Sequence, residues 1–187
     1  DRAEVFTPAW ICNAQNNLID EQWFGRPNVF NVADNQSWQS IENKIEFTNL
    51  ANRSWQDYVD ARRLEISCGE APYLVSRYDT VTGGEISLMQ RIGLLDRKMR
   101  IVNENTAKKT DWLKWAQRAF EAVYGYEYQG DSLFLARENL FYTFIDNYYY
   151  KFEEMPDNKE LDKIANIISL NICKMEGFTY CVPYSDI

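Results

Sequence analysis

The sequence has 187 residues, 45% hydrophobic and 15% aromatic, a composition typical of one globular domain with a sizeable core. It contains no histidine, which excludes Ser-His-Asp and Cys-His nucleophiles and a histidine general base. The formal net charge of −8 is unlike that of a domain that grips DNA phosphates unaided. Any catalysis must therefore rest on carboxylates, Lys, Tyr, backbone groups or a cofactor.

The four cysteines are widely spaced and form no CxxC pair; they are Cys12, Cys68, Cys173 and Cys181. This pattern predicts free, mostly buried thiols in a reducing compartment and neither a disulfide framework nor a metal site. The sequence contains no run of 18 apolar residues, so it predicts no membrane-spanning helix. Its first residues lack the basic and apolar regions of a signal peptide. We expect a cytoplasmic protein without a membrane partner.

Residues 1–60 are predicted to form an N-terminal helical arm. Thr7 is a suitable N-cap and Pro8 a suitable first helical residue, and helical spacing follows at Trp10, Ile11, Ala14, Leu18 and Ile19. Residues 25–54 are polar and rich in Asn, which indicates a loop-bearing excursion with a possible short strand at 44–47. A short helix is expected at 55–61.

Residues 61–187 are predicted to form an α/β domain. Strand patterns at 63–67, 123–127 and 171–175 alternate with helical patterns, whereas a turn at 68–72, a helix start at 73–78 and an irregular stretch at 79–105 separate the first two strands. The three main helices are expected at 111–122, 131–150 and 161–169. This alternation predicts about three parallel strands flanked by helices, joined by right-handed crossovers.

Three strand ends carry candidate ligand-binding residues, because ligands of parallel α/β sheets bind at the carboxyl ends of the strands. Cys68-Gly69-Glu70 follows the first strand, and Gly69 would let the backbone approach a ligand closely. Glu127 ends the second strand and can accept both ribose hydroxyls of a nucleoside cofactor. Glu176 follows the third strand and can accept from an adenine amino group. Each alone is more typical of an ordinary turn or an exposed carboxylate than of a ligand site.

Four segments in chain order strengthen this hypothesis. Residues 4–8 (EVFTP) resemble a "G-E-x-F-T-P" element, residues 64–74 (LEISCGEAPYL) a "D-P-x-C-G-x-G-x-F-L" loop, and residues 123–140 a "YG-x-(E/D)" segment ending in "A-R-x-N-L". Residues 171–177 are similar to "N-I-x-x-G-D". Together they resemble the amino-methylating DNA methyltransferases of bacterial restriction-modification systems, in the class whose cofactor motifs precede the catalytic motif.

The resemblance covers residues 4–177 and implies a partial Rossmann-like methyltransferase fold that binds S-adenosylmethionine. It implies that Phe6, Thr7 and Pro8 contact the methionine end of the cofactor. The floor beneath it would be Cys68, Gly69 and Glu70, with Glu127 on the ribose and Glu176 on the adenine. The parent protein would methylate the adenine amino group of DNA, so the implied partners are DNA, the remaining methyltransferase domain and a target-recognition domain.

The sequence also departs from this family. Ala71 replaces the second glycine of the loop, so the backbone approach there is expected to differ, and an insertion at roughly 79–110 separates Gly69 from Glu127. The catalytic tetrapeptide (N/D/S)-P-P-(Y/F) does not occur; the nearest string is Cys181-Val182-Pro183-Tyr184. We therefore expect a cofactor-binding fragment that is inactive alone. Its first strand would be an exposed sheet edge that promotes self-association or weakens cofactor affinity.

Two other functions stay open. Asp34 with Glu42-Asn43-Lys44 is loosely similar to the acidic pattern of a Mg²⁺-dependent nuclease of a restriction system. Six tryptophans and twelve tyrosines are also compatible with a non-enzymatic protein-interaction domain, since aromatic side chains anchor interfaces.

Overall fold

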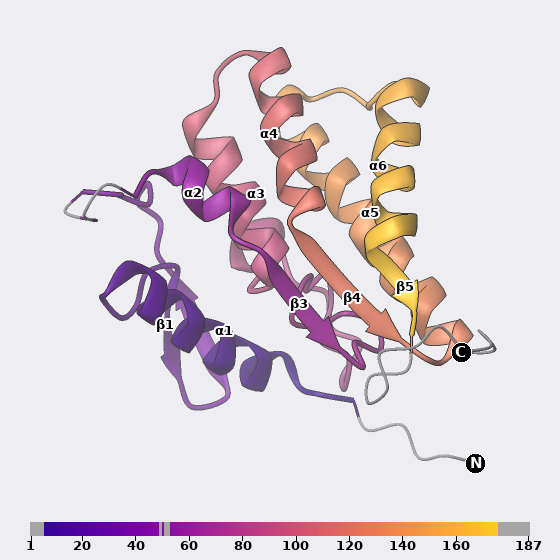
Figure 1. Ribbon diagram of the computed structural model, residues 1–187. Coiled ribbons are helices and arrows are strands. Elements are labelled where there is room, and N and C mark those ends of the chain that lie inside the picture. Colours follow the sequence, from indigo (N-terminus) through magenta and orange to yellow (C-terminus); the bar gives the residue numbers. More distant parts are fainter. Residues whose placement is uncertain (1–5, 49, 51–52, 176–187) are drawn as a thin grey trace.

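The computed structural model describes residues 6–48, 50 and 53–175. Its centre is a three-stranded sheet of β3 (Arg63–Ile66), β4 (Val123–Glu127) and β5 (Ile172–Lys174), in the order β3-β4-β5. Both pairs of neighbouring strands are parallel (Figure 1). The expected α/β class with a three-stranded parallel sheet and flanking helices is confirmed at this level.

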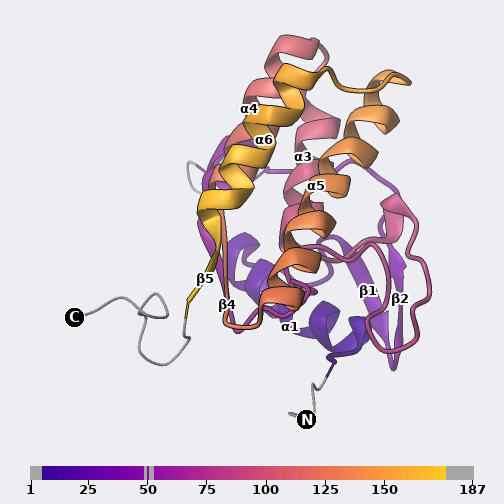
Figure 2. The same cartoon turned by 90° about the vertical axis from the view of Figure 1, so that its right-hand side faces the viewer.

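The helices cover one face of this sheet. They are α3 (Leu94–Asn105), α4 (Lys109–Glu121), α5 (Gly130–Phe152) and α6 (Asn158–Asn171), whereas α2 (Trp55–Asp60) precedes β3 and packs against α3 and α4. Figure 2 shows the sheet nearly edge-on, with α3, α4, α5 and α6 to one side of it. This arrangement follows from the handedness rule, because two right-handed crossovers that step in the same direction, β3 to β4 and β4 to β5, lie on the same face.

The opposite face of the sheet carries apolar side chains. Side chains alternate along a strand and register-matched residues of parallel strands share a face, which places Leu64 beside Tyr124 and Ile66 beside Tyr126. Leu64 is 48% and Ile66 is 44% exposed. Parallel sheets are normally covered on both faces, so this bare face is unusual for the fold. In the described part of the chain, no strand pairs with the outer edge of β3.

Local sequence explains where several helices begin. Ser54 and Asp57 form a reciprocal capping box at the start of α2, and Asp157 and Glu160 form another at the start of α6. α4 begins earlier than expected, with Lys108 as its N-cap residue. The apolar faces of α4 and α5 then pack together around Trp112, which is fully buried and forms edge-to-face contacts with the side chains of Tyr148 and Phe152.

Two predictions for the first crossover were wrong. Residues 73–78 form no helix, since a turn ends at Leu74 and Tyr78 forms an isolated bridge, whereas the stretch expected to be irregular contains a 3₁₀ turn, Leu88–Gln90, and the helix α3. Charged residues hide the apolar spacing of α3, because Arg97 and Lys98 are buried in it. The aliphatic part of a long basic side chain packs like an apolar residue when its charged end has partners, which a pattern of residue types does not reveal.

The N-terminal arm also differs from its prediction. It consists of α1 (Ala9–Phe24) and an antiparallel hairpin, β1 (Asn31–Asp34) and β2 (Ser37–Ser40). No strand forms at 44–47, where a strand was expected. The hairpin turn uses Asn35 with φ 51°, a left-handed conformation that Asn tolerates better than most residues.

α1 buries its polar face. Asn13, Asn16 and Asp20 are almost completely buried, whereas Leu18 is 66% exposed. The reason lies on α3, because Arg97 donates to Asp20 at 2.5 Å and to Asn13 at 2.9 Å. Thus the periodic apolar residues correctly predicted a helix but not the face that packs. None of the helices in residues 6–48 and 53–175 is long and apolar enough to cross a membrane.

Candidate functional site

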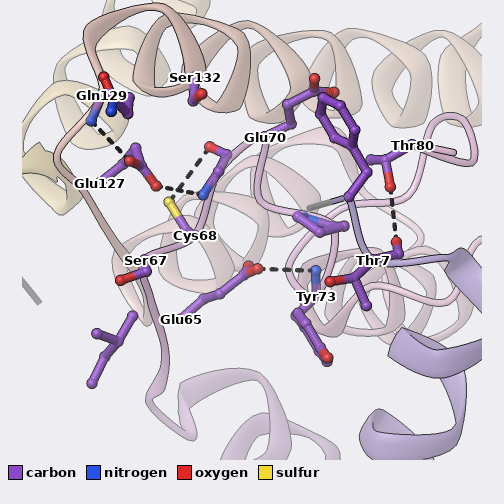
Figure 3. Close-up of a pocket in the computed structure, with 14 residues that line it drawn as sticks. Thr7, Glu65, Ser67, Cys68, Glu70, Tyr73, Thr80, Glu127, Gln129 and Ser132 are labelled. Atoms are coloured by element: carbon purple, nitrogen blue, oxygen red, sulfur yellow. Dashed lines mark hydrogen bonds between the residues drawn. The ribbon is translucent and has the colours of Figure 1, made fainter. Parts of the chain in front are cut away.

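A pocket opens at the carboxyl ends of β3 and β4 (Figure 3). Its walls come from the loop that follows β3, the end of β4, the start of α5 and the residues before α1. The cavity volume is ≈ 220 Å³, just below the range of about 300–1,000 Å³ that is usual for small-molecule sites. Its lining includes Phe6, Thr7, Glu65, Cys68, Gly69, Glu70, Tyr73, Thr80 and Glu127.

The loop after β3 has a strained backbone. Ser67, Gly69 and Ala71 all have left-handed φ values, 53°, 54° and 62°. This conformation suits glycine but costs other residues roughly 1–2 kcal/mol each. Ala71 therefore adopts the conformation that favours glycine, despite having a side chain. Such strain persists only where surrounding contacts hold it, and it is concentrated at functional sites.

Glu127 makes one of the contacts that hold the loop after β3. Its Oε2 accepts from the backbone N–H of Gly69 at 2.7 Å, and its Oε1 accepts from the backbone N–H of Gln129 at 2.8 Å. The carboxylate is 7% exposed and lines the pocket. A carboxylate has about four acceptor positions, and the described residues fill two of those on Glu127. The structure thus brings Glu127 and Gly69 together, as the hypothesis of a shared strand-end site requires.

Glu65 is a pocket carboxyl group that sequence reasoning did not single out. It lies on β3, one strand position before the exposed Ile66, and points to the helical side of the sheet. Its carboxyl oxygens accept from the backbone N–H groups of Tyr73 at 3.4 Å and Leu74 at 3.2 Å. Burial raises the pKa of Glu65 to about 8, against the hydrogen bonds from Tyr73 and Leu74, and the nearby Glu127 raises it further.

Glu70 is held at both ends. Its side chain accepts from the hydroxyl of Tyr78 at 2.5 Å, and its backbone oxygen accepts from Asn139 Nδ2 at 3.2 Å. Asn139 also donates to the Tyr78 hydroxyl at 3.0 Å, so α5 and the loop after β3 share one hydrogen-bond network. Asn139 belongs to the segment at 136–140 that resembles "A-R-x-N-L". Its contacts give that segment a structural role at the pocket.

The residues before α1 close the pocket on another side. Phe6 and Thr7 line it, whereas Pro8 is not among the lining residues. Pro8 is the N-cap residue of α1 and has no capping side chain, which corrects the prediction that Thr7 caps the helix. The first helical N–H, that of Ala9, donates instead to Asp79 at 2.7 Å.

The pocket is acidic. Glu65, Glu70 and Glu127 contribute carboxyl groups, and its described lining contains no Lys or Arg. Such a cavity favours a ligand that carries positive charge, because no basic side chain in the described lining offsets Glu70 and Glu127 and a nearby cation favours ionisation of Glu65.

The thiols nearby are not nucleophiles. Burial raises the pKa of Cys12 to about 12, and burial also raises the pKa of Cys68, with Glu65 and Glu127 adding to the effect. Both thiols are therefore protonated at neutral pH. Cys12, Cys68 and Cys173 are unpaired, and Cys181 lies outside the described residues.

Two other predicted sites gain no support. Glu176, expected to meet the adenine, lies outside the described residues. Asp34 and Glu42 are both exposed, and Asp34 ends β1 in the hairpin. Residues 6–48 and 53–175 contain no group of three or more Cys, Asp or Glu side chains placed to hold a metal ion.

Comparison of the chain with protein-family models, curated proteins and solved structures finds no match. Functional inference therefore depends on the geometry and charge of the pocket.

Proposed function

We propose that this chain binds S-adenosylmethionine, as the cofactor-binding portion of a DNA adenine methyltransferase of a restriction-modification system. The observation that carries the proposal is the acidic pocket at the ends of β3 and β4, beside a strained loop. At neutral pH, S-adenosylmethionine carries a sulfonium and an ammonium against one carboxylate, so its net charge is positive. Ligands of parallel sheets bind at this edge.

The pocket residues fit the parts of the cofactor. The acceptor oxygens of Glu127 suit the two ribose hydroxyls, and Gly69 has no side chain to obstruct the approach. Glu65 and Glu70 suit the cationic groups, and Phe6 offers an apolar surface beside them. When bound, the cofactor supplies an activated methyl group. The chain's own residues bind and orient it, and none of the described residues is assigned to the transfer itself.

DNA contacts and catalysis are assigned to other parts of a parent protein. The net charge of −8 and the absence of the (N/D/S)-P-P-(Y/F) tetrapeptide support this division. The free edge of β3 and the bare face around Leu64 and Tyr124 suit the remaining methyltransferase domain, because both are surfaces that this fold normally covers.

Calorimetric titration tests the proposal. The wild-type chain is expected to bind S-adenosylmethionine and S-adenosylhomocysteine, with the cationic ligand binding more tightly. Glu127→Ala should weaken binding of both, whereas Glu121→Ala, which removes an exposed carboxylate at the end of α4, should not. Absence of binding to both ligands, together with metal-dependent DNA cleavage that is lost in Glu42→Ala, would favour the nuclease function instead.

A further inference from the structure

Three consecutive residues of the first crossover connect two sides of the pocket, the loop after β3 and the residues around the start of α1. Tyr78, Asp79 and Thr80 follow the loop after β3, and Asp79 and Thr80 begin the insertion that the sequence predicted at roughly 79–110. Together we call these three residues the pocket clasp. Each uses its side chain for a hydrogen bond to another segment.

Tyr78 contacts the loop after β3 and α5. Its hydroxyl donates to the carboxylate of Glu70 at 2.5 Å and accepts from Asn139 at 3.0 Å. Burial raises the pKa of Tyr78, and hydrogen bonding to Glu70 raises it further, against the opposing effect of Asn139. The hydroxyl therefore stays protonated and keeps Glu70 in a fixed position at neutral pH.

Asp79 contacts the N-terminal arm. Its Oδ2 accepts from the backbone N–H of Ala9 at 2.7 Å, and this bond supplies the cap that α1 lacks locally. Its Oδ1 accepts from the N–H groups of Val81 and Thr82. Partial burial alone would raise the pKa of Asp79, but these hydrogen bonds outweigh it and the pKa is lowered. Asp79 is thus an anion at the positive end of α1.

Thr80 contacts Thr7, one of the residues before α1 that line the pocket. Its hydroxyl donates to the backbone oxygen of Thr7 at 2.8 Å, and both residues line the pocket (Figure 3). Thr7 is therefore held by a side chain that lies more than seventy residues later in the chain.

The clasp is itself rigidly supported. The chain folds back at Gly83, which has φ 70°, and Tyr78 forms a β-bridge with Glu85. The backbone oxygen of Asp79 accepts from the N–H of Gly83, and the backbone N–H of Asp79 donates to the oxygen of Gly84. Just before the clasp, Arg77 donates to Asp146 of α5 at 3.1 Å. A segment tied to α5 and to itself provides a fixed point from which to position the arm.

We propose that the pocket clasp positions the arm against the loop after β3 and thereby sets the affinity of the pocket for its ligand. Tyr78, Asp79 and Thr80 are positioning residues, acting through Glu70, Ala9 and Thr7. The part of this inference that concerns affinity rests on the proposed binding of S-adenosylmethionine. The part that concerns the arm stands on the contacts alone.

Paired substitutions of Thr80 isolate the effect. Thr80→Val keeps the shape but removes the hydroxyl, whereas Thr80→Ser keeps the hydroxyl. One lost hydrogen bond should weaken binding of S-adenosylhomocysteine about threefold to tenfold in Thr80→Val. Thr80→Ser should restore wild-type affinity. The matched control is Thr106→Val, because the Thr106 hydroxyl also donates to a backbone oxygen, that of Val102 in α3, away from the pocket.

Hydrogen exchange of the arm adds a readout that does not need a ligand. Asp79→Ala and Thr80→Val should speed amide exchange in residues 7–12 of the free protein, and Thr106→Val should leave exchange there unchanged. Tyr78→Phe should leave the arm protected but weaken ligand binding, since it releases Glu70.

The outcomes separate the two proposals. If the wild type binds S-adenosylhomocysteine, and Thr80→Val and Thr80→Ser both bind it with wild-type affinity, the clasp inference is overturned and the proposed function stands. If the wild type binds neither ligand, the proposed function fails, and exchange decides the clasp. Faster exchange confined to residues 7–12 then supports its hold on the arm, and unchanged exchange refutes it.

Discussion

The carboxylate of Glu127, at the end of β4, accepts the backbone N–H of Gly69, in the loop after β3, at 2.7 Å. This bond joins the ends of two neighbouring parallel strands and fixes the acid beside the loop without a ligand. It also satisfies a backbone donor in a strained turn. The same side chain can therefore serve the fold and the pocket, so its two roles need separate measurements.

Substitution of Glu127 should separate these roles. Glu127→Ala removes a charged acceptor, and one hydrogen bond to such an acceptor is worth roughly 1.5–3 kcal/mol, so binding of S-adenosylhomocysteine should weaken at least about tenfold. Glu127→Gln keeps an acceptor oxygen and should lose less affinity. Calorimetry gives the affinities and thermal melting gives the stability. Equal affinities of wild type and Glu127→Ala, in protein that melts cooperatively, would remove Glu127 from the site.

Glu65 predicts a pH-dependent stability of the ligand-free protein. Its pKa is raised from 4.5 to about 8, mainly by burial. Its stabilising contribution is therefore complete below pH 4.5 and is lost as the pH rises through 8. The free energy of unfolding should fall between these limits, and Glu65→Gln should flatten that fall. Urea unfolding at several pH values measures this free energy. The same pH dependence in wild type and Glu65→Gln would contradict the assignment to Glu65.

A cationic ligand should reverse the preference of the folded protein for a protonated Glu65. Binding beside Glu65 favours the ionised carboxyl group, so S-adenosylmethionine should release a proton from the protein below pH 8 and bind more tightly as the pH rises toward 8. Cys12, Cys68 and Tyr73 also face Glu65, but their pKa values are raised and they stay neutral. Calorimetry in two buffers of different ionisation enthalpy counts the protons. The same measurement on Glu65→Gln gives the number of protons that the ligand's own amino group releases.

The sequence predicted the sheet better than the arm. The three strands follow from short β-branched and aromatic runs between helical patterns, and β4 spans Val123–Glu127 as expected. The hairpin was missed because its strands are short and polar; in β1 three of the four residues are exposed. α3 was missed because Arg97 and Lys98 are buried through partners far away in sequence.

For the site, strand-end logic correctly brought Gly69, Glu70 and Glu127 to one pocket. It could not identify Tyr78 to Thr80, because their role depends on a crossover that folds back to α1, a tertiary relationship with no local pattern. The sequence did offer a signal for Glu65, because it is an acidic residue inside an apolar strand. Burial of a carboxyl group is costly without compensating contacts, so such a residue is a candidate for a functional role. The chemistry of such a group follows only from its neighbours.

The buried pair between α1 and α3 should be costly to break. The side chains of Asp20 and Arg97 are 3% and 1% exposed, and Asp20 also accepts from Tyr58 at 2.8 Å. Arg97→Met leaves a buried carboxylate without its cation, which should lower the free energy of unfolding by about 3–5 kcal/mol. Arg118→Met, which breaks an exposed pair with Asp60, should cost less than about 1 kcal/mol. Denaturant unfolding compares them, and equal losses would contradict the structure.

The free edge of β3 predicts that the isolated chain associates with itself. Leu64 lies on this strand, is 48% exposed and lies outside the pocket, so Leu64→Lys changes the edge and spares the ligand site. A lysine on an edge strand opposes pairing, and a buried Leu contributes roughly 1.5–3 kcal/mol, so self-association should weaken at least about tenfold. Sedimentation over a concentration series measures it. Leu18→Lys, the same exchange on an exposed part of α1, should leave association unchanged. A wild-type chain that stays monomeric and binds the cofactor tightly would mean that neither the edge nor the bare face needs another protein segment.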